Sequence, residues 1–239
     1  MNKKVFHAAG TRGHADHGWL NTYHSFSFAG YHDPERIHFG ALRVLNDDTV
    51  AGGSGFGKHP HDNMEIITIV LKGALEHQDS MGHTQAIRPG EVQVMSAGTG
   101  IFHSEYNHNK DEDVELFQVW IFPDKRNVTP RYDQRMFDTE ERKNKVQQLV
   151  SSIDNDEEGL KIHQDARISR VSLDAGKEIN YKLADEKHGL YLLVVEGNVT
   201  AAGQQMGRRD GYGIAGDANV TIKGETDSDI LILEVPMYM

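Results

Sequence analysis

Short runs of β-branched and aromatic residues, separated by Gly and Pro, make up most of this chain and constrain its fold more than any other feature. Val, Ile, Thr, Phe and Tyr favour strands, whereas Gly and Pro favour the turns between them. Helical periodicity is almost absent, and many short strands joined by such turns are typical of an all-β sandwich or barrel. In the first half we expect strands at residues 25–28, 37–45, 65–71, 91–95 and 114–122.

A second set of strands follows a polar connection. Residues 124–145 are rich in charged side chains, and Thr139 to Lys143 resembles a short polar helix or loop. After this connection we expect strands at residues 168–173, 190–196, 211–214, 220–222 and 230–235. The turn at Gly197 repeats those at Gly73 and Gly90. The chain is therefore predicted to contain two copies of one barrel, in residues 1–135 and 136–239.

Two pairs of metal-ligating side chains stand at a spacing of two residues, namely His59 with His61 and His103 with Glu105. In a β-strand, residues i and i+2 point to the same face, so each pair can aim both members at one point. Each pair also follows a Gly-rich turn. If the two strands lie side by side, three imidazoles and one carboxylate converge on a single cation.

The residue types limit the metal and the kind of site. Nitrogen and oxygen ligands suit Fe, Mn, Ni, Cu or Zn, and four of them leave coordination positions free in an octahedral ion, as in a catalytic site. The alternative is that the pairs arise by chance, because the chain has 14 His. The second half has only His163 and His188 and no such pair. We therefore expect one metal per chain, in the first half.

Composition excludes several other classes of function. The chain has no Cys, so disulfides, thiolate ligands and a thiol nucleophile are excluded. Its 25 basic and 36 acidic residues give a net charge of −11, which opposes binding to a phosphate backbone. No run of about 18 apolar residues occurs. We expect a soluble, cytoplasmic protein without a nucleic-acid or membrane partner.

The first half contains a dense set of short motifs, namely His59-Pro60-His61-Asp62-Asn63-Met64-Glu65, Gly73, His77, Asp79-Ser80, Gly82, Pro89-Gly90, Gly98 and Ile101-Phe102-His103-Ser104-Glu105. Together these motifs resemble those of the pirin family of bicupins. Upstream, residues 12–20, 24–28 and 42–46 are similar to the bacterial branch. The resemblance is dense over residues 8–123 and thinner afterwards.

This resemblance implies two stacked jelly-roll cupin barrels, one non-haem metal in the N-terminal barrel and quercetin 2,3-dioxygenase activity, as in several members. Fe(II) is the metal we expect. In the implied reaction Glu105 takes the proton of the flavonol 3-hydroxyl, dioxygen reacts at carbons 2 and 3, and ring opening releases carbon monoxide and a depside. Some eukaryotic pirins are iron-dependent cofactors of transcription factors, a role that no feature of this chain supports.

Cupins differ in the origin of the carboxylate ligand. Many take it from the first motif, where Glu65 stands, and pirins take it from the second, where Glu105 stands. Along a straight strand Glu65 would lie roughly 13 Å beyond His61, at about 3.3 Å per residue. We therefore expect Glu105 to be the ligand and catalytic base, and Glu65 to orient a His N–H at the pocket.

The candidate substrate-pocket residues are Asn46, Phe56, Glu65 and Gln118. Phe56 can wall an aromatic substrate or pack in the core, and Asn46 matches a polar pocket position of pirins or caps a turn. Gln118 lies in an apolar strand and points either inward or to solvent. The remaining histidines, His24 and His77 among them, are interpreted as surface or structural residues.

Two other classes of function remain open. The same ligands with Zn or Mn would serve a non-redox enzyme such as an isomerase or hydrolase. A non-enzymatic, iron-dependent redox sensor that docks on a protein partner is the third class. Metal identity and oxygen uptake discriminate between these classes. In each case we expect the chain to be a monomer.

Overall fold

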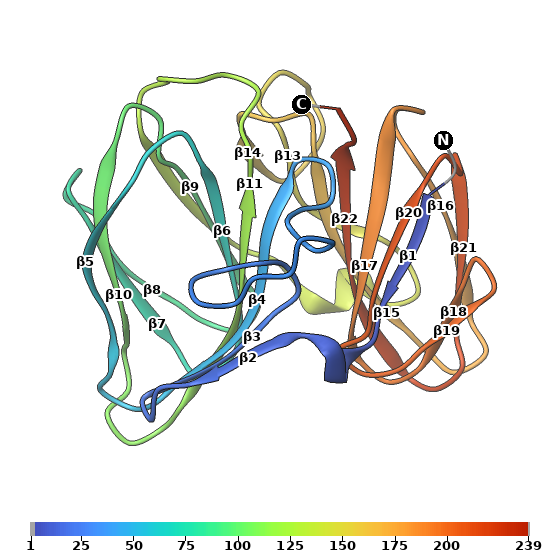
Figure 1. Cartoon of the computed structure of the whole chain (residues 1–239), viewed down its shortest axis with the longest axis horizontal. Helices are drawn as coiled ribbons and strands as arrows, with labels where there is room; N and C mark the ends of the chain where they lie inside the picture. Colours follow the sequence, from blue (N-terminus) through green and yellow to red (C-terminus); the bar gives the residue numbers. More distant parts are fainter. Residues whose placement is uncertain (1–2, 239) are drawn as a thin grey trace.

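The computed structural model describes residues 3–238, and almost all of its regular structure is β-strand. Two barrels lie side by side (Figure 1), each built from one seven-stranded and one four-stranded sheet. The predicted all-β fold with two barrels is therefore confirmed. Two short 3-10 turns are also present, η1 (Ala9–Thr11) and η2 (Thr139–Arg142), the second within the predicted polar segment. No helix in the described range is long and apolar enough to span a membrane.

The first barrel pairs its strands in the orders β12-β9-β6-β11-β4-β3-β2 and β5-β10-β7-β8. Its strands are β2 (Gly13–Asp16), β3 (Leu20–His24), β4 (Leu42–Val50), β5 (Gly55–His61), β6 (Glu65–Lys72), β7 (Leu75–Asp79), β8 (Thr84–Ile87), β9 (Glu91–Ser96), β10 (Ile101–Asn107), β11 (Val114–Ile121) and β12 (Arg131–Met136).

The second barrel has the orders β1-β20-β17-β22-β15-β13-β14 and β16-β21-β18-β19. Its strands are β1 (Lys3–His7), β13 (Gln147–Ser152), β14 (Leu160–Ile162), β15 (Arg167–Leu173), β16 (Glu178–Lys182), β17 (His188–Glu196), β18 (Val199–Ala201), β19 (Gln204–Met206), β20 (Gly211–Ala215), β21 (Asn219–Gly224) and β22 (Ser228–Pro236).

The N-terminal strand belongs to the sheet of the second half. β1 pairs antiparallel with β20, with Lys3 opposite Ala215 and His7 opposite Gly211. Figure 1 shows this blue strand among the red strands of the second barrel. The predicted first unit, residues 1–135, thus includes a segment that the fold uses in the other barrel. The boundary between the two units near residue 135 stays a prediction. β1 itself is part of the second barrel.

The central strands of the seven-stranded sheet in the first barrel are buried on both faces. Along β11, Phe117 and Val119 belong to an apolar core that also contains Tyr191 and Leu231 of the second barrel. The alternate residues Gln118 and Trp120 line a cavity inside the first barrel. A strand covered on both faces is apolar on both sides, which explains the nearly unbroken apolar run at residues 66–71 of β6.

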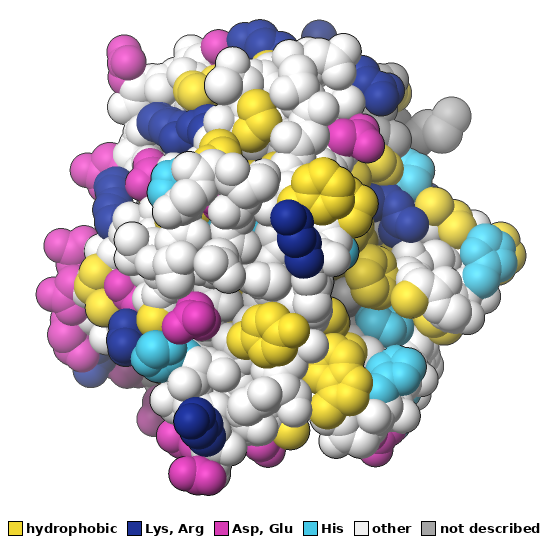
Figure 2. Space-filling view, turned by 90° about the vertical axis from the view of Figure 1, so that its left-hand side faces the viewer, with side chains coloured by type: hydrophobic (Ala, Val, Ile, Leu, Met, Phe, Trp, Pro, Cys, Tyr) yellow, Lys and Arg dark blue, Asp and Glu magenta, His cyan; other side chains and the backbone are white. Residues whose placement is uncertain are grey.

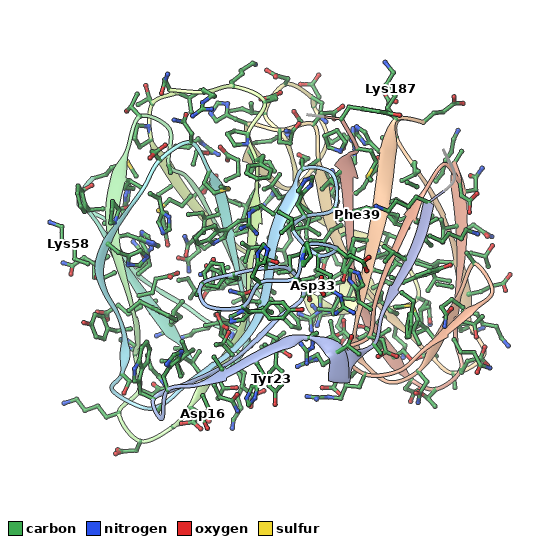
Figure 3. All side chains as sticks on the ribbon, viewed as in Figure 1. Asp16, Tyr23, Asp33, Phe39, Lys58 and Lys187 are labelled. Atoms are coloured by element: carbon green, nitrogen blue, oxygen red, sulfur yellow. The ribbon has the colours of Figure 1, made fainter. Side chains whose placement is uncertain are left out.

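Two of the expected strands differ in the structure. Residues 25–28 form only an isolated bridge from Phe28 to Tyr31. The strand expected at residues 37–45 is displaced along the chain and forms β4 (Leu42–Val50). The chain turns at Gly40, where φ is +51° and a Cβ atom would approach the Pro236 carbonyl oxygen to 2.3 Å. This turn holds Phe39 between the barrels (Figure 3) and prevents a continuous strand.

Residues 1–135 expressed alone should aggregate or be degraded. Without the second half, the fragment would expose the face of its sheet that carries Phe117 and Val119, and β1 would lose its partner β20. Size-exclusion chromatography and limited proteolysis, with the full chain as control, test this. A monomeric fragment that resists protease as well as the full chain does would show that the first barrel folds independently.

Candidate metal centre

Three imidazoles come together on neighbouring strands of the first barrel. β10 runs antiparallel to β5, with His103 opposite His59 and Ile101 opposite His61. One ring nitrogen of each of the three His lies within 4.8 Å of the others. The ring centroids are 4.4 Å apart for His59 and His103, and 4.9 Å apart for His61 and His103. The side-by-side strands expected from the spacing are therefore present.

A β-bulge shapes the strand that carries the first pair. His103 is opposite His59, but Glu105 is opposite Phe56, so β5 contains one extra residue between these positions. The bulge lets Phe56 and His59, three residues apart, both line the cavity. At Gly55 the backbones approach so closely that a Cβ atom would lie 2.3 Å from the Glu105 carbonyl oxygen.

The nitrogens of this triad fit a metal cation. His59 Nδ1 lies 2.8 Å from the Gly57 carbonyl oxygen, which can only accept, so Nδ1 donates and Nε2 keeps a free lone pair. His103 Nε2 is buried and has no hydrogen-bond partner within the described part of the chain. Burial, together with the neighbouring imidazoles, lowers the pKa of His61 and of His103 to about 3. Neutral imidazoles are the form that binds metal.

Glu105 lies two residues beyond His103 on β10, opposite His77 of β7. Its carboxylate is buried, and Gln118 Nε2 donates to both oxygens at 3.2 Å. Thr68 Oγ1 in turn donates to Gln118 Oε1 at 3.3 Å. Burial raises the pKa of Glu105. Its carboxylate forms a second group within 4.8 Å, with His103 and His77, rather than with all three imidazoles of the first group. Ligation by Glu105 therefore stays a prediction.

His77, which the sequence analysis interpreted as surface or structural, is fully buried beside this site. Its Nδ1 lies 3.4 Å from His103 Nδ1, and its Nε2 lies 3.2 Å from Asp79 Oδ2. Hydrogen bonds from His77 and His83 lower the pKa of Asp79 against the opposing effect of burial. This carboxylate can hold the orientation of both imidazoles. His77 and Asp79 are two residues apart, as are the members of each ligand pair, and this spacing could have indicated from the sequence that His77 lies near the metal site.

The triad opens into a cavity of about 850 Å³ inside the first barrel. Asn46, Phe56 and Gln118 line it, as the sequence analysis proposed. Figure 2, which faces this end of the molecule, shows His side chains beside hydrophobic ones. Aromatic rings form much of the wall. Trp120 packs edge-on against His61 with ring centroids 5.0 Å apart, and the other aromatic lining residues are Trp19, Phe28 and Tyr31.

Glu65 does not line this cavity. The interior face of β6 carries Ile66, which lines the cavity, so the neighbouring Glu65 points to the opposite face of the sheet. There its Oε2 accepts a hydrogen bond from Ser96 Oγ at 2.7 Å, and it also accepts one from the His163 backbone. The expected contact between Glu65 and a metal-site His is therefore absent from this structure, because strand alternation sends the two side chains to different faces.

Glu65→Gln should change how stability depends on pH. Burial raises the pKa of Glu65 to about 7, so the native state favours the protonated form. The stability that this preference contributes is fully present below about pH 4.5 and is lost as the pH rises through about 7. Because Gln cannot ionise, the free energy of unfolding of the variant should gain about 1–3 kcal/mol relative to the parent between pH 5 and 8.

Urea denaturation of both proteins at pH 5 and pH 8 measures this difference. Glu112→Gln, at an exposed position, is the control and should show no such gain. An equal pH response of the Glu65 variant and the parent would contradict the role of burial.

Comparison with known proteins agrees with this geometry. Residues 5–121 match the Pirin family model, and residues 149–235 match the model of the quercetinase C-terminal cupin domain. The chain is 46% identical to a quercetin 2,3-dioxygenase of Escherichia coli K12 over 228 residues, which covers 95% of this chain and 96% of that protein. It is 45% identical over 223 residues to a putative quercetin 2,3-dioxygenase of Pseudomonas aeruginosa, with 93% and 95% covered.

A solved structure has the same fold. The bacterial pirin YhhW of Escherichia coli in complex with nickel(II) superposes with a TM-score of 0.92 at 42% identity, covering 98% of this chain and 99% of that one. The relatives match along nearly their whole length and the two barrels coincide with those of a bacterial pirin, so this chain belongs to the pirin family.

Proposed function

We propose that this protein is a metal-dependent dioxygenase that cleaves flavonols such as quercetin with O2. The observation that carries the proposal is the triad of His59, His61 and His103, with a buried Nε2 on His103 that has no partner among the described residues, at an aromatic-lined cavity. The names of the relatives supply the substrate class. In this proposal the three imidazoles and Glu105 hold one divalent transition metal, which we take to be Fe(II).

A metal bound there would act as a Lewis acid toward a substrate hydroxyl and would supply the electronic coupling between substrate and dioxygen. The chain provides the proton acceptor. Glu105 accepts the proton of the flavonol 3-hydroxyl, and the Gln118 amide holds the carboxylate by donating to both of its oxygens. Thr68 donates to Gln118 and so fixes the amide.

The cavity wall orients the flat substrate. Trp120 packs against His61, and Phe28 packs edge-on against Trp120 with ring centroids 5.4 Å apart. Such rings offer a planar apolar surface to the fused rings of a flavonol and keep water away from them. Phe56, brought inward by the bulge in β5, lines the same cavity.

Oxygen uptake with quercetin tests the proposal. Protein purified without added metal is analysed for its elements, stripped with a chelator, and reloaded separately with Fe(II), Mn, Ni, Cu or Zn. We expect uptake and release of carbon monoxide with at least one of these metals, and none with stripped protein. A flavone, which lacks the 3-hydroxyl, is the control substrate and should not react. No uptake with any flavonol or metal would favour the non-redox enzyme or the sensor.

A further inference from the structure

A second polar position lies in the same cavity, on β4. Asp48 lines the cavity and is almost fully buried. β4 places it opposite Thr22 of β3 and Leu116 of β11. Gln118, whose amide donates to Glu105, is two residues beyond Leu116 on β11 and therefore lies on the same face of that strand as Leu116. Asp48 and the metal centre therefore belong to one continuous interior surface.

Asp48 has unused hydrogen-bonding capacity. Among the described residues it takes part in no ion pair, and its one hydrogen bond is a short one donated by the Thr22 hydroxyl. Asp47, on the opposite face of the same strand, is paired with both Arg12 and Arg209 at 2.9 Å. A carboxylate has room for about four donors. Burial of a carboxylate that receives only one hydroxyl hydrogen bond costs free energy unless another group supplies further hydrogen-bond donors. Burial also raises the pKa of Asp48 to about 7.

A neutral donor stands beside it. Asn46 points into the cavity two residues earlier on β4, about 7 Å away along the strand. Its Oδ1 accepts a hydrogen bond from His24 Nδ1 at 2.9 Å, which directs the amide and leaves its NH2 group to donate. Burial lowers the pKa of His24, which favours its neutral form. The cavity wall thus presents an acceptor at Asp48 and a donor at Asn46.

We propose that Asp48, supported by Thr22 and flanked by Asn46, binds phenolic hydroxyl groups on the substrate ring that lies away from the metal, and that it selects hydroxylated substrates. The position of that ring rests on the proposed function. A phenol supplies both the hydroxyl donor that Asp48 lacks and an apolar ring for the walls formed by Trp19 and Phe56. A cationic ligand is disfavoured, because it would share the cavity with a bound divalent cation.

Binding of flavones to the metal-free protein tests this subsite apart from the reaction. Flavones lack the 3-hydroxyl, and a pair with and without hydroxyls on the outer ring differs only in the groups that Asp48 would bind. Both Trp residues of the chain, Trp19 and Trp120, line the cavity, so quenching of their fluorescence reports occupancy. We expect the parent to bind the hydroxylated flavone about tenfold more tightly, as one additional hydrogen bond to a buried carboxyl group implies.

Asp48→Asn should remove most of that preference while leaving the affinity for the bare flavone unchanged. Glu115→Gln is the matched control: this carboxyl lies next to Leu116 on β11, outside the cavity lining, and should leave both affinities unchanged. Thr22→Val provides a second variant if Asp48→Asn does not fold. It removes the one side-chain donor that Asp48 has among the described residues, so the carboxylate is no longer held in place, and the same preference should weaken.

Equal affinity of the parent for the two flavones, or an equal loss for both in the Asp48 variant, would overturn the subsite. Binding of neither flavone would overturn it as well. The protein could prefer the hydroxylated flavone through Asp48 and yet take up no oxygen with any flavonol. That result would support the subsite and contradict the dioxygenase proposal. The two failures are therefore distinguishable.

Discussion

Replacing His103 with alanine should lower the metal content of the purified protein from about one ion per chain to less than about a tenth of that value. His103 belongs to both groups of potential ligands, so its loss leaves neither group complete. Its Nε2 is also one of the buried side-chain nitrogens that have no hydrogen-bond partner among residues 3–238. His59→Ala and His61→Ala should each cause a similar loss. Elemental analysis of protein purified without added metal measures the effect.

The control for this experiment is His108→Ala. His108 is exposed, follows β10 directly and pairs with Glu76 at 2.9 Å, so its removal changes the histidine count without touching the triad. Its metal content should equal that of the parent. Full metal content in a folded His59→Ala, His61→Ala double variant would contradict the assignment of the site to β5 and β10.

Glu105→Gln should lower flavonol cleavage about 10²–10⁴-fold, the usual contribution of a general base. The amide keeps an oxygen near the site but cannot accept the substrate proton at neutral pH. The three imidazoles remain, so part of the metal should stay bound. Oxygen uptake with quercetin is compared with the parent at equal metal loading, so that loss of metal and loss of catalysis are measured separately.

Glu65→Gln is the matched control for the Glu105 variant. It makes the same chemical change in another buried carboxyl, but Glu65 faces away from the cavity and contacts Ser96. Its oxygen uptake should stay close to that of the parent. Equal activity of the Glu105 variant and the parent would exclude Glu105 as the base.

Features that depend on local spacing could be predicted from the amino-acid sequence alone. Strand and turn residues specified an all-β chain with two repeats, because those preferences act within a few residues. The spacing of two in His59-Pro60-His61 placed both imidazoles on one strand face, because side chains alternate along every strand. The absence of a comparable pair in the second half restricted the predicted metal site to the first. Family motifs then indicated a pirin, which the comparisons confirm.

The face of each strand that lines the cavity became known only from the three-dimensional fold. Alternation separates Glu65 from Ile66 and Phe117 from Gln118, but both faces of these central strands are buried, so polarity could not reveal which side encloses the cavity.

Contacts between strands that are far apart in the chain could not be predicted from the sequence either. His77 meets His103 because β7 and β10 pair, and β1 crosses to β20 at the other end of the chain. Asp48 and its neighbour Asp47 have the same charge, yet one faces two Arg side chains and the other a single hydroxyl in a cavity. The folded environment gives two identical carboxylates different chemistry, because burial and partners, rather than residue type, set the free energy of a charge.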